Sequence, residues 1–357
     1  MTKADHGFSR MQFSMLFFSS DARQDKENKY DLLLSCAEYG DKNGFEAVWI
    51  PERHFHQFGG LYPNPSVLGG AIAVKTSRIR IRAGSVILPL HDPIRVVEEW
   101  SAVDNLSGGR VDLAFGQGWN PNDFVLAPGL YVDRLTEMYK DMEIVTSLWQ
   151  GKKTSRLNGM GKICDVEIYP KPIQENLNIW ITCSGSMERF IEAGAYGANI
   201  LTALLFQDRH ELAMKISAYR NARLQHGHDP QAGRVTVMLH TYIGEDIQVV
   251  RREVRPPMLK YLEESVDLWR QKSDQLENLA PNAKEKVLEF AFERYFRSHS
   301  LCGTPESCSP MVTELGDIGV NEIACLLDFG VPIDSVMASL GSLNNLKNIS
   351  NNVMSPA

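Results

Sequence analysis

Glu52, Arg53 and His54 are the first residues whose types and spacing could do chemistry, and they stand directly after the apolar run 47–51. A carboxylate, a guanidinium and an imidazole at one strand end can hold an opposite charge and move a proton. His54 is the candidate proton-transfer group, since an imidazole titrates near neutral pH. The alternative is a structural role, in which His54 hydrogen-bonds the neighbouring backbone.

A glycine-rich turn forms the second group. Gly116, Gln117 and Gly118 follow the apolar run 111–115, and Trp119 comes next. Two glycines let the backbone approach a planar or phosphorylated ligand, and an indole offers a flat apolar wall. The turn is not a dinucleotide-binding fingerprint, because no third glycine or helix start follows at the required place.

The third group is Ser184-Gly185-Ser186, between the apolar run 178–183 and a predicted helix that ends near Gly197. Backbone N–H groups at a helix start, with serine hydroxyls beside them, form an anion site suited to a phosphate. An ordinary serine N-cap is the alternative interpretation, because serine is common at that position.

Neither the histidines nor the cysteines predict a metal site. His54 and His56 have no third ligand at a recognisable spacing, and Cys302 and Cys308 lack a second pair. The six cysteines form no paired framework, and residues 1–10 lack the apolar core of a signal peptide. We therefore expect a reducing, cytoplasmic location.

Composition is typical of an ordinary soluble globular protein. Of the 357 residues, 43% are hydrophobic and 23% are charged, with a formal net charge of −7 and a pI near 5.8. Nucleic-acid and anionic-membrane surfaces favour basic stripes, so the charge argues against both. No apolar run approaches membrane-spanning length. Small molecules or other proteins are the expected partners.

Eight apolar, β-rich runs alternate with helical patterns, which predicts a (β/α)8 TIM barrel in one domain, 1–357. The predicted strands are 12–18, 47–51, 79–88, 111–115, 178–183, 198–201, 235–242 and 322–327. Helices are predicted at 30–42, at 135–149 with Gly151 as the stop, and directly after Ser186. Such a barrel gathers the three groups at the carboxyl ends of its strands.

Residues 255–300 are too long for a strand-to-helix loop and carry helical pattern, which predicts a helical insertion after the seventh strand. A lid over the barrel mouth is the favoured interpretation, because long loops at that face often close sites. A merely decorative helical pair is the alternative.

The motifs together resemble the bacterial luciferase-like, FMN-dependent monooxygenase family. The resemblance runs from residue 11 to about 242, and its most specific segments are 45–55, 87–95 and 107–124. The segments ERHF (52–55) and GWNP (118–121) resemble the sequences of a subgroup associated with polyketide and nonribosomal peptide biosynthesis. The resemblance implies a barrel that binds reduced FMN from a separate flavin reductase, reacts it with O2 and uses the flavin hydroperoxide to oxygenate a substrate.

The resemblance also implies roles for individual residues. Ser184, Gly185 and Ser186 would meet the flavin phosphate, and Gly116-Gln117-Gly118 would border the ring or the phosphate. The Gly84-Ser85 pair falls where relatives carry a non-proline cis peptide bond beneath the flavin. Glu52, Arg53 and His54 would be catalytic. The expected substrate pocket consists of Phe17, Asn64, Trp119 and Asn120.

Two departures from the family pattern leave alternatives open. Arg53 stands where luciferases have a catalytic histidine, and Gln117 stands where they have a phosphate-binding arginine. Arg53, Arg82 or Arg189 would then neutralise the phosphate. The alternatives to an oxygenase are a deazaflavin-dependent dehydrogenase and a noncatalytic flavin-binding subunit.

The expected substrate is an acyl or aminoacyl group, either free or tethered to a carrier protein. Carriers are usually acidic, so docking would need a basic patch such as Arg251, Arg252 and Arg255. Three solvated arginines on a helix are the alternative interpretation. The family commonly dimerises, so we expect a homodimer.

Overall fold

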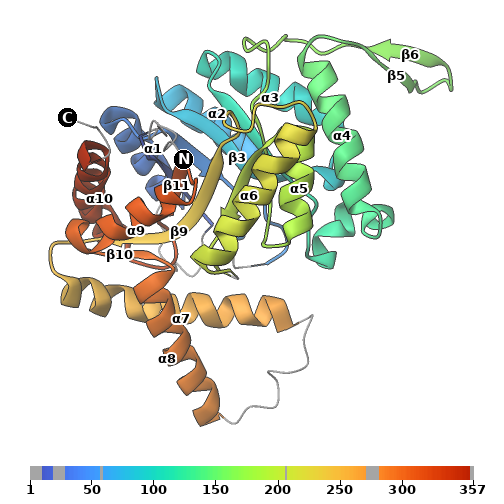
Figure 1. Ribbon diagram of the computed structural model, residues 1–357. Helices are drawn as coiled ribbons and strands as arrows, with labels where there is room; N and C mark the ends of the chain where they lie inside the picture. Colours follow the sequence, from blue (N-terminus) through green and yellow to red (C-terminus); the bar gives the residue numbers. More distant parts are fainter. Residues whose placement is uncertain (1–9, 19–28, 57–58, 206, 271–280, 354–357) are drawn as a thin grey trace.

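Eight parallel strands close into a ring at the centre of the computed structural model, which describes residues 10–18, 29–56, 59–205, 207–270 and 281–353 (Figure 1). Their order is β9-β11-β1-β2-β3-β4-β7-β8, and β8 pairs back onto β9. The eight strands are β1 (Gln12–Leu16), β2 (Ala47–Ile50), β3 (Arg80–Ile87), β4 (Val111–Gly116), β7 (Ile179–Thr182), β8 (Asn199–Ala203), β9 (Val235–Ile243) and β11 (Glu322–Leu326). The predicted TIM barrel and all eight of its strands are confirmed.

Three further strands were not predicted. β10 (Leu301–Gly303) adds a short parallel partner to β9, and β5 (Thr154–Leu157) pairs with β6 (Ile163–Val166) as an antiparallel hairpin. The hairpin escaped prediction because its side chains alternate between half-buried and exposed, without an apolar face. β10 is only three residues long, which is too short to show a period.

Helices surround the barrel, as the alternating pattern predicts. They are α1 (Asp31–Asn43), α2 (Pro65–Lys75), α3 (Pro93–Ser107), α4 (Arg134–Trp149), α5 (Met187–Tyr196), α6 (Arg209–Gln225), α7 (Ile247–Arg270), α8 (Pro281–Ser298), α9 (Pro305–Asp317) and α10 (Ile333–Val353), with short 3-10 turns η1 (Leu88–Leu90), η2 (Pro121–Leu126) and η3 (Pro128–Leu130). The three helices with predicted bounds agree within about a residue, and Gly197 ends α5 at a φ of 81°.

The helical insertion is present as α7 and α8, which extend together below the barrel in Figure 1. α7 begins at Ile247, so the predicted start at residue 255 is eight residues late; residues 271–280 of the predicted segment lie outside the described ranges. Ion pairs from Arg251 to Glu293 and from Arg255 to Glu289 tie the two helices together.

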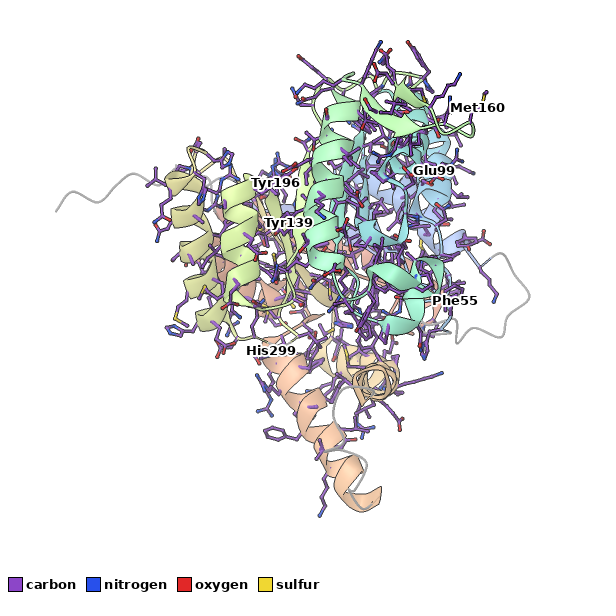
Figure 2. All side chains as sticks on the ribbon, turned by 90° about the vertical axis from the view of Figure 1, so that its right-hand side faces the viewer. Phe55, Glu99, Tyr139, Met160, Tyr196 and His299 are labelled. Carbon is purple, nitrogen blue, oxygen red and sulfur yellow. The ribbon has the colours of Figure 1, made fainter. Side chains whose placement is uncertain are left out.

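The two ends of the barrel differ in what covers them. Figure 2 shows Phe55, just past the carboxyl end of β2, at the end nearer α7 and α8, while Met160 of the β5–β6 hairpin lies at the opposite end. The carboxyl ends of the strands therefore form the mouth that α7 and α8 approach. None of the helices in the described ranges is long and apolar enough to cross a lipid bilayer.

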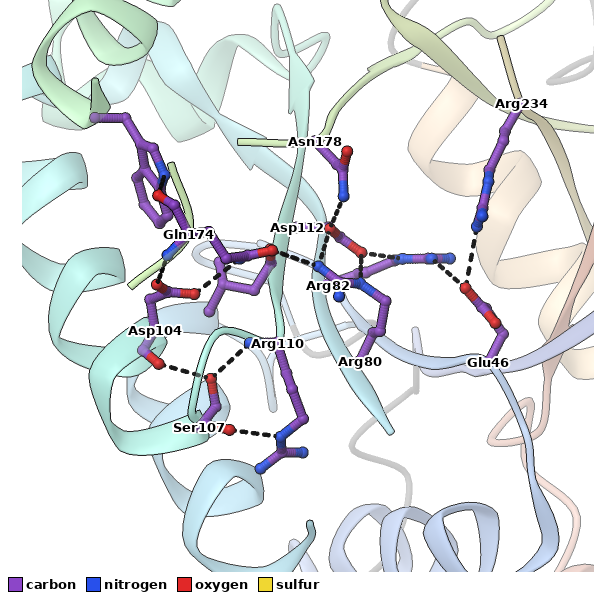
Figure 3. Close-up of polar contacts among 12 residues, drawn as sticks. Glu46, Arg80, Arg82, Asp104, Ser107, Arg110, Asp112, Gln174, Asn178 and Arg234 are labelled. Carbon is purple, nitrogen blue, oxygen red and sulfur yellow. Dashed lines mark hydrogen bonds and ion pairs between the residues drawn. The ribbon is translucent and has the colours of Figure 1, made fainter. Parts of the chain in front are cut away.

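An ion-pair network that includes Glu46, Arg82 and Asp112 lies at the amino-terminal ends of β2, β3 and β4, away from the mouth (Figure 3). Arg82 donates to Asp112 at 2.8 Å and to Glu322 at 2.6 Å, and its guanidinium lies 4.9 Å and 4.5 Å from the rings of Trp49 and Trp180. Burial lowers the pKa of Arg82, but the two carboxylates outweigh it and raise the net value. Arg82 is thus committed to the core, and its predicted role at the flavin phosphate is wrong.

Candidate active site

Glu52 is the centre of a buried hydrogen-bond cluster at the mouth. Its Oε1 lies 2.8 Å from Nε2 of His54 and 2.5 Å from Nε2 of His91, and its Oε2 accepts from the backbone N–H of Ile87 at 2.7 Å. The Glu52 side chain is 0% exposed. Glu52 and His54 lie two and four residues past the end of β2, whereas His91 follows η1 after β3. Within the described ranges no group of three or more His, Cys, Asp or Glu side chains could hold a metal ion.

The hydrogen bonds of this cluster shift the pKa values of Glu52 and His91. Burial raises the pKa of Glu52, but hydrogen bonds from His54 and His91 outweigh burial, so the net pKa lies below the usual range. Burial lowers the pKa of His91, and the bond to Glu52 outweighs it and raises the net value. An ionised carboxylate only accepts, so His54 presents Nε2–H to Glu52. The lone pair of a neutral His54 is then on Nδ1.

His91 was missed at the sequence level. It stands four residues after the end of β3, in the run Leu88-Pro89-Leu90-His91. A polar residue just past a predicted barrel strand was the available signal, because such positions face the mouth. The apolar residues that separate His91 from the strand end concealed it.

Arg53 places its guanidinium against aromatic rings at the mouth. Its centre lies 4.8 Å from the Trp119 ring and 5.7 Å from the Phe18 ring, and its residue is 3% exposed. Within the described residues, Nε and Nη2 are buried without any hydrogen-bond partner. Burial lowers the pKa of Arg53, while the charges of Asp123 and Tyr261 oppose that shift.

The Gly84–Ser85 peptide bond is cis, as the resemblance implied. Glycines around it are required by packing. A Cβ at Gly84 would stand 2.8 Å from the Trp49 ring, and one at Gly116 would stand 2.7 Å from Oγ of Ser85. Gly118 has a φ of 74°, and a Cβ there would stand 2.8 Å from the Phe124 ring. Close protein contacts thus account for these glycines, and a role in binding a cofactor stays a prediction.

The predicted pocket residues have different surroundings. Phe17 is 0% exposed within the core. Asn64 is exposed and caps α2 by accepting from the N–H of Ser66, and Asn120 caps η2 while donating to Asp123 at 2.9 Å. The Trp119 ring contacts the guanidinium of Arg53, a group of the candidate site.

Ser184-Gly185-Ser186 joins β7 to α5 as predicted. Ser186 occupies the N-cap position, but its side chain makes no capping bond and contacts Glu188 instead. Gly185 has a φ of 121°, and a Cβ there would meet one side-chain atom within 4 Å, Nζ of Lys215 at 3.9 Å.

Lys215 of α6 is the cation at this turn, and its Nζ donates to Gln207 at 2.9 Å. Lys215 could not be found from the sequence, because no spacing rule links a helical lysine to a turn thirty residues earlier. Arg189, which was considered for the phosphate, instead forms an ion pair with Glu192.

Aromatic side chains of α7 and α8 meet His240 of β9. The His240 ring lies 4.3 Å from the Tyr261 ring, and Nδ1 of His240 lies 3.2 Å from the hydroxyl of Tyr295. Burial lowers the pKa of His240 to about 3, and its Nε2 has no partner among the described residues. A Cβ at Gly330 would stand 3.1 Å from Pro257, so α7 also packs on the loop after β11.

A parallel barrel with a buried, charged cluster at its mouth defines a TIM-barrel enzyme. The chain belongs to the luciferase-like monooxygenase family, whose family model matches residues 11–322. It is 24% identical over 352 residues to the oxygenase component of a flavin-dependent trigonelline monooxygenase from Acinetobacter baylyi, and the alignment covers 94% of each chain.

Solved structures share the fold. The oxygenating constituent of 3,6-diketocamphane monooxygenase from Pseudomonas putida, solved with FMN, superposes with a TM-score of 0.76 at 17% identity, covering 97% of this chain and 100% of that one. An F420-dependent secondary alcohol dehydrogenase gives 0.68 at 16% identity, covering 93% and 97%. The fold is therefore shared by enzymes that use FMN and by enzymes that use a deazaflavin.

Proposed function

We propose that the chain is the oxygenase component of a two-component monooxygenase that receives reduced FMN from a separate flavin reductase. The observation that carries this proposal is the buried Glu52–His54–His91 cluster at a mouth approached by α7 and α8. The name of the Acinetobacter baylyi relative, an oxygenase component, supports the division into two proteins.

The residues present fit an FMN phosphate. The N-terminus of α5 offers N–H groups that favour an anion, and Lys215 brings a cation next to Gly185. Ser184 is exposed at the same turn and offers a hydroxyl donor, whereas the hydroxyl of the neighbouring Ser186 donates to Glu188. Lys215 thereby replaces Arg82 and Arg189 as the proposed phosphate counter-charge.

Reduced FMN, when bound, supplies the electrons that activate O2. The residues of the chain hold the proton and exclude water. Glu52 fixes His54 with its lone pair on Nδ1, which lets that atom accept and return a proton during oxygen transfer. Tyr261 and Tyr295 cover the β9 side of the mouth, where water would divert the reaction.

The substrate is proposed to be a small acyl or aminoacyl compound. Docking of a carrier protein on Arg251 and Arg255 is less favoured, because both arginines already have acidic partners on α8. A pull-down of a carrier protein at low and high salt, with wild type and with a charge reversal at the exposed Arg252, tests whether docking occurs there.

The deazaflavin-dependent dehydrogenase is the second candidate, favoured by the fold shared with the F420-dependent alcohol dehydrogenase. Binding and oxygen uptake separate the two. We expect reduced FMN to bind more tightly than the reduced deazaflavin, and we expect O2 uptake with FMN. Tight deazaflavin binding without O2 uptake contradicts the oxygenase, and FMN binding that leaves oxygen reactivity unchanged indicates a noncatalytic subunit.

A further inference from the structure

Arg53 carries a buried positive charge whose hydrogen-bonding edge is unsatisfied. The residue is 3% exposed, yet Nε and Nη2 have no partner among the described residues. A buried donor without an acceptor costs free energy, and more when it is charged. A group with this cost is therefore expected to find its partner in a ligand.

The identity of the two unpaired atoms specifies the partner. Nε–H and the adjacent N–H of Nη2 lie on one edge of the guanidinium and point in nearly the same direction, as a fork. Two parallel N–H donors match the two oxygens of a carboxylate, which is the geometry of a bidentate arginine–carboxylate pair. A neutral carbonyl would satisfy one donor and leave the charge uncompensated.

The surroundings hold this fork at the mouth. Trp119 of the β4 loop and Phe18 of the β1 end lie against the guanidinium, which limits its rotation. The stem packs tightly on Gly59, where a Cβ would stand 2.8 Å from Cγ of Arg53. Tyr261 of α7 interacts electrostatically with Arg53, so the insertion reaches the same group.

The nearby carboxylate does not substitute for a ligand. Asp123 attracts Arg53 but is itself hydrogen-bonded by Asn120 at 2.9 Å. Burial raises the pKa of Asp123, against the opposing charge of Arg53. Asp123 therefore does not accept a hydrogen bond from Nε or Nη2 of Arg53.

We propose that Arg53 is a specificity-determining residue that binds a carboxylate of the substrate through its Nε–Nη2 edge. The Glu52–His54 pair adjoins Arg53 in sequence at the same strand end, so the anchored substrate lies beside the proposed proton-transfer group. The inference rests on the proposed function only in calling the bound anion a substrate. It assigns Arg53 to substrate, not to the flavin phosphate.

Binding of matched probes tests this assignment without turnover. Full-length protein, with and without saturating FMN, is titrated by ligand-observed NMR with benzoate and benzamide, nicotinate and nicotinamide, and hexanoate and hexanamide. We expect at least one carboxylate to bind tenfold or more tightly than its amide, with or without FMN. In Arg53→Gln that carboxylate should lose about 10-fold to 100-fold in affinity, while its amide is unchanged.

Two further variants make the result specific. Arg53→Lys keeps the charge but not the fork, so it should restore part of the lost affinity and less than the wild type. This conservative variant also tests the inference if Arg53→Gln does not fold. Arg234→Gln removes an arginine that pairs with Glu46 at the other end of the barrel and should leave the carboxylate preference intact.

Three outcomes overturn the inference. They are the absence of a carboxylate that outbinds its amide, a preference that survives in Arg53→Gln, and competition between FMN and the carboxylate, which would assign the fork to the cofactor. Failure of oxygen activation would count against the proposed function and would leave these binding constants untouched.

Discussion

Replacing Glu52 by glutamine should remove the stabilising charge of the mouth cluster without creating a cavity. Gln keeps the volume and one acceptor oxygen, so the bond from the N–H of Ile87 can persist. The bonds from His54 and His91 to a charged carboxylate are lost. Hydrogen bonds to charged groups contribute about 1.5–3 kcal/mol each. The His91 side chain is 33% exposed, and solvent weakens its bond to Glu52, so this bond is placed at the low end of that energy range.

The expected loss in free energy of unfolding is therefore about 3–4.5 kcal/mol, and it should depend on pH. The lowered pKa of Glu52 makes its contribution present above its ordinary value of 4.5 and lost as pH falls through the folded value. The raised pKa of His91 makes its contribution present below 6.5 and lost as pH rises through the folded value. The contributions of Glu52 and His91 to stability are therefore both present between pH 4.5 and pH 6.5.

Denaturant unfolding of wild type and Glu52→Gln at a series of pH values measures this difference. The difference should be largest near pH 6 and should shrink toward pH 9. Glu98→Gln, which removes a surface ion pair with Arg95, is the matched control and should cost less than about 1 kcal/mol at every pH. A Glu52→Gln difference that is negligible, or that does not change with pH, would refute the account of the cluster.

Three further predictions concern the cofactor, the proton and the insertion. Lys215→Met should weaken FMN binding by about 10-fold or more and leave riboflavin binding unchanged, while Lys215→Arg retains most of the FMN affinity; equal losses for FMN and riboflavin would reject the phosphate role. His54→Ala should keep the FMN dissociation constant but slow product formation under single-turnover conditions, measured by stopped flow; an unchanged rate would remove His54 from proton transfer. Tyr261→Ala should speed the return of bound reduced flavin to the oxidised form in air by severalfold relative to Tyr261→Phe, and equal rates would leave the insertion without a role in excluding water.

Much of the fold could be predicted because it depends on local periodicity. Each barrel strand is a short apolar run bounded by helical pattern, and the closing of a βα series follows from handedness and burial. The hairpin at residues 154–166 could not be predicted in this way. It buries no continuous apolar face, so tertiary context alone makes it a pair of strands.

The candidate site was predicted only in part, because side chains from different strands meet there. The strand-end position of Glu52 and His54 was visible in the sequence, but their link to His91 depends on the path of the backbone after β3. Lys215 reaches Gly185 from another helix, and Arg82 was misassigned because nothing local separates a core arginine from one at the mouth. Residue type is visible in the sequence, whereas which end of the barrel a side chain occupies depends on register.

The central claim is that this barrel protects reduced flavin while it reacts with oxygen. Rapid mixing of the protein and photoreduced FMN with oxygenated buffer, recorded by near-ultraviolet absorbance, tests it most directly. The account predicts a spectral species that is neither reduced nor oxidised flavin and that persists well beyond the protein-free reaction. Direct return to oxidised FMN at the protein-free rate would contradict it.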